Sequence, residues 1–264
     1  MGNYLITGAL GGMGQALCRT LTGAGHRVWG LDRPSDHLAP EGWTLVPADL
    51  TKPEEVEAAF RRVREEAESL DGIVHMAGVY DLASLAEMPE EDFLRDFNVN
   101  LFGVFRVNRQ FLPLLGEGGR IVIVSSELAP LPALPFTGIY AVTKTAVDKY
   151  AEALRMELQL LGKAVIVLRP GAVDTGMLSV STEKLSRFCE ETKLYSCNAA
   201  RFRRIVERVE ARAVPPERVA AVALKALACP RPRPVYTINR NPLLLLFRFL
   251  PQGTRLWAIR KILS

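Results

Sequence analysis

The stretch "IYAVTK" holds a tyrosine and a lysine four residues apart. Tyr140 and Lys144 therefore share one face of the helix that the pattern over 139–162 predicts. A phenol with its ordinary pKa of about 10 is a poor acid–base group near neutral pH. A neighbouring ammonium favours the phenolate and lowers that pKa toward the working range. Such a pair also arises often by chance, so its interpretation depends on other motifs.

A glycine-rich turn, "TGALGGMG", runs from Thr7 to Gly14 and includes Met13. Gly8, Gly12 and Gly14 allow a sharp turn and the close approach of a pyrophosphate, which the free N–H groups of a helix N-terminus bind well. An ordinary strand-to-helix turn is the alternative. The position of the next acidic residue favours a dinucleotide site.

That acidic residue, Asp32, ends the second apolar run about 20 residues further on. A carboxylate there accepts hydrogen bonds from both ribose hydroxyls of NAD and repels the 2′-phosphate of NADP. Arg33 favours the opposite choice, because a guanidinium can hold a phosphate. We predict NAD, with NADP as the alternative. Asp49 could accept from the adenine amino group, cap the next helix, or do both.

The elements that position these groups follow from an alternating pattern. The apolar runs "NYLITG", "RVWGLD", "WTLVPAD", "GIVHMAG", "RIVIVSS" and "AVIVLRPG" are typical of buried parallel strands, and amphipathic stretches separate them. We predict an α/β fold, a Rossmann-like doubly wound parallel sheet flanked by helices on both faces. Residues 1–240 would form one domain, 174–213 a helical insertion over the substrate site, and 241–264 an apolar, basic tail.

Composition excludes several classes of protein. The net charge of only +4 does not require nucleic-acid binding. The four cysteines and three histidines lack metal-ligand or disulfide-framework spacing. A strand-like run begins almost at Met1, so we expect no cleaved leader and a cytoplasmic setting.

Together the motifs resemble the short-chain dehydrogenase/reductase family, including its hydroxysteroid dehydrogenases. The resemblance covers about residues 3–240, and its motifs occur in the family's order. They are "TGALGGMG", Asp32, "ADL" (48–50, with Asp49 and Leu50), "AG" (Ala77 and Gly78), Asn100, "VSS" (124–126), "YAVTK" (140–144) and "RPGAVDTGM" (169–177).

The resemblance implies a role for each matching residue. Tyr140 would be the general acid–base, and Lys144 would hold the nicotinamide ribose and lower the tyrosine pKa together with the oxidised nicotinamide. Ser126 would hydrogen-bond the substrate oxygen, and Asn100 would hold a water that links Lys144 to solvent. The nicotinamide carboxamide would be seated by Pro170, Gly171, Val173 and Thr175.

Two positions depart from the family's pattern. Where the family usually has two asparagines before Ala–Gly, this chain has His75 and Met76, so we expect altered strand bonding and a packed His75. The family's serine usually lies thirteen residues before the tyrosine, a position that Glu127 holds here. Either the proline-rich loop carries one extra residue and Ser126 keeps the role, or Glu127 takes it. We favour Ser126, because catalysis needs a donor there. Glu127 would then lie at the substrate rim or a neighbouring loop, solvated or capping.

The insertion carries apolar residues among basic ones, which predicts an apolar pocket with positive charge nearby. We expect a bulky hydrophobic alcohol or ketone, such as a steroid, bile acid, retinoid or keto-lipid. Alternatively, about half of these apolar residues pack the insertion on the core. The candidates are Met177, Leu178, Leu185, Phe188, Leu194, Tyr195 and Phe202, with Leu131, Leu134 and Phe136 opposite.

The tail has no acidic residue, since none follows Glu217. Its apolar run is too short to span a bilayer. It could lie on anionic lipid, pack on a partner subunit or close over the substrate site. The resemblance implies assembly through the helices over about 90–115 and 139–161. Both are too apolar for a monomer's surface, so we expect a homodimer or homotetramer.

The leading hypothesis is an NAD-dependent oxidoreductase that transfers hydride to or from a secondary alcohol carbon. An NADPH-dependent 3-oxoacyl reductase and a non-enzymatic dinucleotide sensor are the alternatives. Asp32 argues against the first alternative, and the intact Tyr140–Lys144 pair argues against the second.

Overall fold

The protein forms a doubly wound α/β sandwich, and the computed structural model describes residues 1–34 and 42–264. All strand pairs of its seven-stranded sheet are parallel. Across the sheet the order is β3 (Thr44–Pro47), β2 (Arg27–Asp32), β1 (Asn3–Thr7), β4 (Leu70–His75), β5 (Leu115–Val124), β6 (Ala164–Pro170) and β7 (Val235–Ile238). The predicted fold class is therefore confirmed.

Helices cover both faces of the sheet because its strands are apolar on both sides. On one face, α1 (Gly12–Gly23) packs beside α8 (Pro216–Ala228). The other face carries α2 (Pro53–Glu66), α4 (Gly103–Phe111) and α5 (Gly138–Leu158). The strand order reverses between β1 and β4, where a ligand crevice is expected at the carboxyl ends of the strands.

The long apolar helix expected near 90–115 is present and contains a π-helical turn. It consists of α3 (Glu90–Phe97), a π-helical turn η1 (Asn98–Phe102), α4 and a short 3₁₀ turn η2 (Leu112–Leu114). A second 3₁₀ turn, η3 (Gln159–Leu161), follows α5 and ends at Gly162, whose φ is +67°. π-Helical turns often occur at functional sites.

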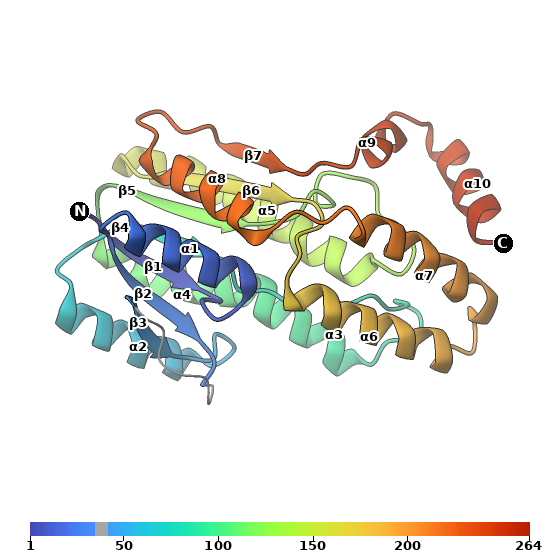
Figure 1. Cartoon of the computed structure of the whole chain (residues 1–264), viewed down its shortest axis with the longest axis horizontal. Coiled ribbons are helices and arrows are strands. Elements are labelled where there is room, and N and C mark those ends of the chain that lie inside the picture. Colours follow the sequence, from blue (N-terminus) through green and yellow to red (C-terminus); the bar gives the residue numbers. More distant parts are fainter. Residues whose placement is uncertain (35–41) are drawn as a thin grey trace.

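Helices from the second half of the chain lie beyond the carboxyl ends of the strands, at the right of Figure 1. They are α6 (Gly176–Glu191), α7 (Ser196–Glu210), α9 (Pro242–Arg248) and α10 (Gln252–Leu263). We call α6 and α7 the lid, and residues 241–264 the tail. No described helix is both long and apolar enough to cross a bilayer.

The lid and the end of the tail share a small core of their own. Leu263 of α10 is buried there, and its carbonyl accepts a 2.6 Å hydrogen bond from the Asn198 side chain. The tail therefore packs on its own lid through one side of α10. Other members of this core are Leu82, Phe136, Leu185, Phe202 and Val206.

Candidate active site

The glycine-rich turn is built so tightly that side chains are excluded from it. Gly8 has a φ of +68°, and a Cβ there would lie 2.5 Å from the backbone nitrogen of Ala77. A Cβ on Gly14 would lie 2.0 Å from the carbonyl oxygen of Gly8, and one on Gly12 would lie 2.8 Å from the Thr175 side chain. The glycine-rich turn, the Ala77–Gly78 motif and the segment that contains Thr175 thus meet at the start of α1.

Asp32 braces this turn from the end of β2. Its carboxylate accepts 2.8 Å hydrogen bonds from the backbone N–H groups of Leu10 and Arg33. The side chain remains partly exposed, and that of Arg33 is exposed. The acid is therefore fixed beside the turn, with acceptor capacity left for ribose hydroxyls.

Asp49 bonds to its own turn. Its carboxylate accepts hydrogen bonds from the backbone N–H and the hydroxyl of Thr51, at 2.9 and 2.7 Å. Lys52, which flanks the start of α2, makes no side-chain capping bond. Asp49 thus stabilises the turn before the helix and does not cap the helix itself. The Leu50 side chain is buried against Gly103.

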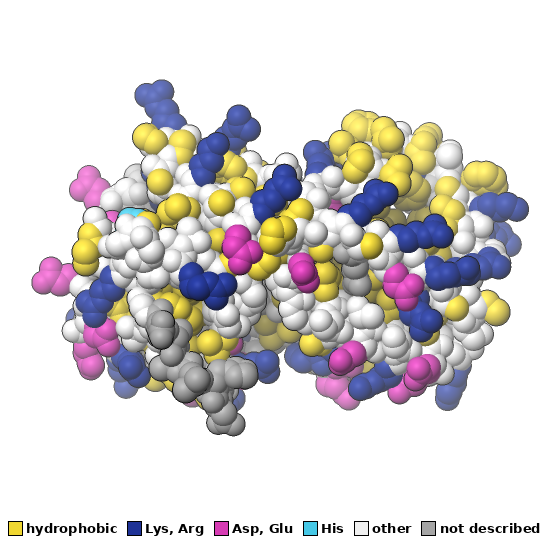
Figure 2. Space-filling view, viewed as in Figure 1, with side chains coloured by type: hydrophobic (Ala, Val, Ile, Leu, Met, Phe, Trp, Pro, Cys, Tyr) yellow, Lys and Arg dark blue, Asp and Glu magenta, His cyan; other side chains and the backbone are white. Residues whose placement is uncertain are grey.

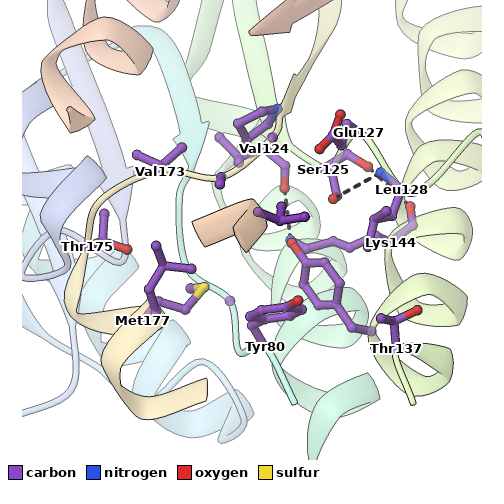
Figure 3. A pocket seen from close by; sticks show the side chains of 18 of the residues that line it. Tyr80, Val124, Ser125, Glu127, Leu128, Thr137, Lys144, Val173, Thr175 and Met177 are labelled. Atoms are coloured by element: carbon purple, nitrogen blue, oxygen red, sulfur yellow. Dashed lines mark hydrogen bonds between the residues drawn. The ribbon is translucent and has the colours of Figure 1, made fainter. Parts of the chain in front are cut away.

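Tyr140 and Lys144 line the pocket from the first two turns of α5. Figure 3 shows Lys144 opposite Val124, the last residue of β5. The Lys144 ammonium donates a 3.0 Å hydrogen bond to the Val124 carbonyl, and its nitrogen lies 5.8 Å from the centroid of the Tyr140 ring. Burial lowers the pKa of Lys144 to about 8, and the nearby Asp148 acts in the opposite direction.

The pKa of Tyr140 differs from the expectation. Burial raises it to about 12; a hydrogen bond with the Ser126 side chain acts against the rise, and the Glu127 charge adds to it. Protein groups alone therefore do not lower this pKa, because the loss of hydration outweighs the hydrogen bond with Ser126.

The two serines that end "RIVIVSS" face different partners. The Ser126 side chain bonds to Tyr140, and its oxygen also accepts a 3.2 Å hydrogen bond from the Leu128 N–H. Ser125 donates to the Lys144 carbonyl at 3.3 Å. Glu127, which the alternative placed in the serine role, bonds elsewhere: its carboxylate accepts a 2.7 Å hydrogen bond from the Asn241 N–H. Glu127 was expected to be solvated or to cap a helix, and it is buried instead.

Asn100 sits inside the π-helical turn η1 and is buried. Its side chain accepts from the Val79 N–H at 2.8 Å and donates to the Val79 carbonyl and the Thr143 hydroxyl, both at 3.0 Å. A Cβ on Gly78 would come within 3.1 Å of the Asn100 Oδ1 and 3.4 Å of the Lys144 Nζ. Gly78 thus lets Asn100 and Lys144 approach one another.

His75 packs in the sheet, as expected. Its Nε2 lies 2.8 Å from the Asn108 Oδ1, and Asn108 in turn donates to the Tyr150 hydroxyl at 3.1 Å. Burial lowers the pKa of His75 to about 4, against the opposing effect of the Asn108 hydrogen bond. The imidazole is therefore neutral at physiological pH. The next residue, Met76, pairs its N–H with the Thr7 carbonyl.

The segment after β6 forms one wall of the site. The Gly171 N–H donates to the Ile238 carbonyl at 2.8 Å, and Val173 pairs with Val214 in an isolated bridge. Pro170, Gly171, Val173 and Thr175 all line the same pocket as Tyr140 and Lys144. The residues that the resemblance assigned to the nicotinamide therefore lie opposite the candidate acid–base pair.

Above this floor the pocket is apolar, and Figure 3 shows Met177 and Tyr80 facing into it. Of the residues expected to line it, Met177, Leu178, Leu134 and Phe202 do so. Others pack in the lid core instead, namely Leu185, Phe136, Phe188 and Tyr195. Leu194 is exposed, and Leu131 is not among the lining residues. The expectation that about half would serve packing is close to what is found.

Several lining residues were not identified from the sequence. Ile205, Val206 and Val209 follow Phe202 at helical spacing on α7, a pattern that could have revealed them. Leu244 reaches the pocket from the tail, and Tyr80 from the loop after β4. No local signal marks those two, since only the tertiary fold brings them near Tyr140.

The residues present fit a dinucleotide. The turn of α1 offers backbone N–H groups where a Cβ would clash, Asp32 stands at its side, and an apolar pocket with one buried ammonium begins beyond Thr175. Among the described residues no cluster of three or more His, Cys, Asp or Glu side chains could hold a metal ion.

Comparison with known proteins gives consistent results. The sequence is 28% identical over 264 residues to a 3-ketodihydrosphingosine reductase of Bacteroides thetaiotaomicron, covering 97% of this chain and 96% of that one. It is 34% identical over 198 residues to human 17-beta-hydroxysteroid dehydrogenase type 6, covering 71% of this chain and 62% of the other.

Among solved structures, a short chain dehydrogenase family protein from Francisella tularensis superposes with a TM-score of 0.75 at 22% identity, covering 90% of this chain and 97% of that one. A variant of an actinorhodin polyketide ketoreductase, solved with NADPH, gives a TM-score of 0.74 at 26% identity, covering 90% and 95%. The family model described as short chain dehydrogenase matches residues 3–186. With this match and the fold and site already described, the chain belongs to the short-chain dehydrogenase family.

Proposed function

We propose that this oxidoreductase interconverts a secondary alcohol and a ketone with NAD as its cofactor, and that its substrate is bulky and apolar. The observation that carries this proposal is the hydrogen-bonded Ser126–Tyr140 pair, which lies beside the buried ammonium of Lys144 at the floor of an apolar pocket. A binding protein without catalysis has no need for a buried acid–base pair of this kind.

The nicotinamide supplies the hydride donor or acceptor, and its oxidised form adds a positive charge that favours the phenolate. In the proposed mechanism, Ser126 donates a hydrogen bond to the substrate oxygen. Tyr140 gives a proton to that oxygen in reduction and takes it back in oxidation. Lys144 holds the ribose, while Asn100 positions a water that connects Lys144 to solvent. The apolar walls exclude other water from the reacting groups.

The dinucleotide would be held by residues from four segments. The turn from Thr7 to Gly14 would bind the pyrophosphate, Asp32 the ribose, and Asp49 with Leu50 the adenine. Ala77 and Gly78 would lie along the ribose. The carboxamide would be seated by Pro170, Gly171, Val173 and Thr175.

Asp32 supports NAD over NADP, because its carboxylate is fixed by two backbone donors and cannot turn away easily. The competing function, an NADPH-dependent 3-oxoacyl reductase, is favoured by the exposed Arg33. The ratio of kcat/KM with NADH and NADPH decides between them. A ratio above one supports this proposal, and a ratio well below one supports the reductase.

The substrate class rests on the pocket walls, which α6, α7 and the tail supply with apolar side chains. Hydroxysteroids and long-chain keto-lipids fit this chemistry, and the names of the two relatives described above fall in these classes. Activity confined to short polyols or sugars would exclude an apolar substrate.

Replacing Tyr140 by Phe tests the mechanism. Tyr140→Phe keeps the ring that packs on Tyr80, with centroids 4.5 Å apart, and removes only the hydroxyl. We expect kcat to fall by about 10²–10⁴-fold with NAD affinity nearly unchanged. Tyr150→Phe, on the same helix but outside the pocket, serves as the control and should keep its activity. Unchanged turnover in Tyr140→Phe would refute the mechanism.

We also propose that the outer side of the tail binds an anionic lipid surface, as a peripheral contact of a cytoplasmic enzyme. The apolar residues Leu243, Leu246, Phe249, Leu256, Trp257 and Ile262 are exposed there. Figure 2 shows hydrophobic side chains gathered over α9, with basic side chains nearby. The tail is basic and free of acids, which suits anionic headgroups better than an average protein surface.

Exposed apolar residues also occur on the helices expected to form an oligomer. Phe102 and Phe105 lie near the start of α4, and Met156, Leu160 and Leu161 near the end of α5. Side chains of this size rarely stay exposed in such numbers on a monomer. They support the proposal of a homodimer or homotetramer, which light scattering coupled to size exclusion measures directly.

A further inference from the structure

The buried carboxylate of Glu127 lies beside the reacting groups and has no role in the mechanism above. Its residue is only 7% exposed and lines the pocket directly after Ser126 (Figure 3). The main chain fixes it in place, since its N–H donates to the Pro170 carbonyl at 2.9 Å. The charge therefore sits at the floor of the pocket, next to the hydroxyl that would hold the substrate oxygen.

Few groups of the protein compensate the charge of the Glu127 carboxylate. One oxygen, Oε2, accepts the Asn241 N–H, while Oε1 faces Gly171, where a Cβ would lie 2.9 Å from it. No ion pair within the described part of the chain includes Glu127, although Arg240 lies close enough to act on it electrostatically. A buried carboxylate is unfavourable unless it is paired or fully hydrogen-bonded.

For a plain ketone this carboxylate works against the chemistry. Negative charge beside Tyr140 disfavours the phenolate and repels negative charge that develops on the substrate oxygen. A cationic group on the substrate, close to its reacting carbon, would neutralise the carboxylate and remove both penalties. An ammonium is such a group, because it provides three donors and a full charge.

The rest of the pocket indicates the remainder of the ligand. Beyond Glu127 and Lys144, its walls carry aliphatic and aromatic side chains from both lid helices and from Leu244. We propose that Glu127 binds the ammonium of an amphiphilic amino alcohol or amino ketone, with the amine on the carbon next to the reacting one and an aliphatic chain along α7. This inference names the substrate class of the proposed function and rests on it.

A structural role for Glu127 is the competing explanation, since its bond to Asn241 ties the start of the tail to the pocket. Glu127→Gln separates the two. Glutamine keeps the size of the side chain and an oxygen that can accept the Asn241 N–H, and it loses the charge. Glu87→Gln is the matched control, because the Glu87 carboxylate accepts hydrogen bonds from the Lys193 and Leu194 N–H groups between α6 and α7, yet does not line this pocket.

The test uses two twelve-carbon secondary alcohols that differ only in an ammonium on the carbon next to the carbinol. With NAD present, we expect the wild type to prefer the amino alcohol in kcat/KM by at least about tenfold. Glu127→Gln should raise KM for the amino alcohol about tenfold and leave the plain alcohol unchanged or improved. Glu87→Gln should keep the wild-type preference.

Two results would overturn the inference: equal use of both alcohols by the wild type, or equal losses for both in Glu127→Gln. Oxidation of the plain alcohol without preference would leave the proposed function intact. If neither alcohol is oxidised, calorimetric titration of the NAD-loaded protein with dodecylammonium and dodecanol still decides. The ammonium should bind at least about tenfold more tightly to the wild type than to Glu127→Gln, and equal binding contradicts the inference.

Discussion

The two ends of the pocket are held by different forces. At the sheet end, functional groups sit on strand ends and on the first turns of α1 and α5, and backbone hydrogen bonds fix them. At the lid end, α6 and α7 rest on an aromatic cluster around Phe136 and on a few polar contacts from Asp81 and Glu87.

This difference separates chemistry from selectivity. Hydrogen bonds from a parallel sheet leave little freedom, so the sheet end can hold reacting groups in register. Packing of side chains in a small core tolerates substitution and movement more readily. We infer that changes at the sheet end affect cofactor binding and catalysis, whereas changes at the lid end affect the choice of substrate.

The largest effect is expected at the glycine turn. Gly14→Ala places a Cβ 2.0 Å from the Gly8 carbonyl oxygen, which belongs to backbone and cannot rotate away. We expect NAD affinity to fall by about 100-fold or more and unfolding free energy to fall by about 3 kcal/mol. Fluorescence titration and denaturant unfolding measure the two quantities.

Gly23→Ala is the matched control on the same helix, since a Cβ there meets nothing within 4 Å. It should keep NAD affinity and gain a little stability. Equal effects of the two substitutions would show that the turn is not tightly constrained.

The next effect concerns His75, which departs from the family's asparagine. Its folded pKa of about 4 lies below the ordinary histidine value of 6.5, so the unfolded chain binds more protons between these two pH values. Stability should therefore rise with pH from about 4 to 6.5, and acidification through this range should remove about 3 kcal/mol.

His75→Asn should remove this part of the pH dependence. Denaturant unfolding at pH 4.5 and 7 with both proteins measures it, and the difference between them cancels other titrating groups. If both proteins lose the same stability on acidification, His75 is not buried in its neutral form.

A smaller effect is expected at the lid. Phe202 lines the pocket and packs against Phe136, with ring centroids 5.3 Å apart. Phe202→Ala should raise KM for bulky substrates by about 10- to 100-fold, because about 1.5–3 kcal/mol of apolar contact is lost, while NAD affinity stays the same. Leu194→Ala, at an exposed position between α6 and α7, is the control and should leave KM unchanged. A comparable loss of NAD affinity in Phe202→Ala would contradict the separation of the two ends.

The smallest effect concerns the outer side of the tail. Phe249 and Trp257 are 76% and 67% exposed, so replacing both by Ser should leave activity on dispersed substrates unchanged. Flotation with vesicles that contain phosphatidylserine should fall several-fold relative to the wild type, with neutral vesicles as the comparison. Equal flotation of both proteins would show that the tail's exposed side chains do not bind lipid.

The sheet end could be predicted from sequence because its requirements are local. Gly8 and Gly14 are required by a turn that excludes a Cβ, and Tyr140 and Lys144 share a face by helical spacing alone. The apolar strands indicate a parallel sheet, which places their carboxyl ends together. The helix expected near 90–115 is present, although the π-helical turn around Asn100 within it has no clear sequence signal. The raised pKa of Tyr140 was not predicted, since it depends on burial in the folded chain.

The lid end was decided by tertiary structure. Met177 and Leu185 are both apolar residues of α6, yet one lines the pocket and the other fills the lid core. Which of them faces the pocket depends on how α6 and α7 pack together. Hydrophobic periodicity predicts that one face of a helix is buried, but it does not identify the element that packs against that face. The sequence by itself determined the family and the positions of Tyr140, Lys144 and the glycine turn, because these depend on local motifs. Only the tertiary structure brought Leu244 to the pocket and the Asn241 N–H to Glu127, and buried the Glu127 carboxylate beside Ser126.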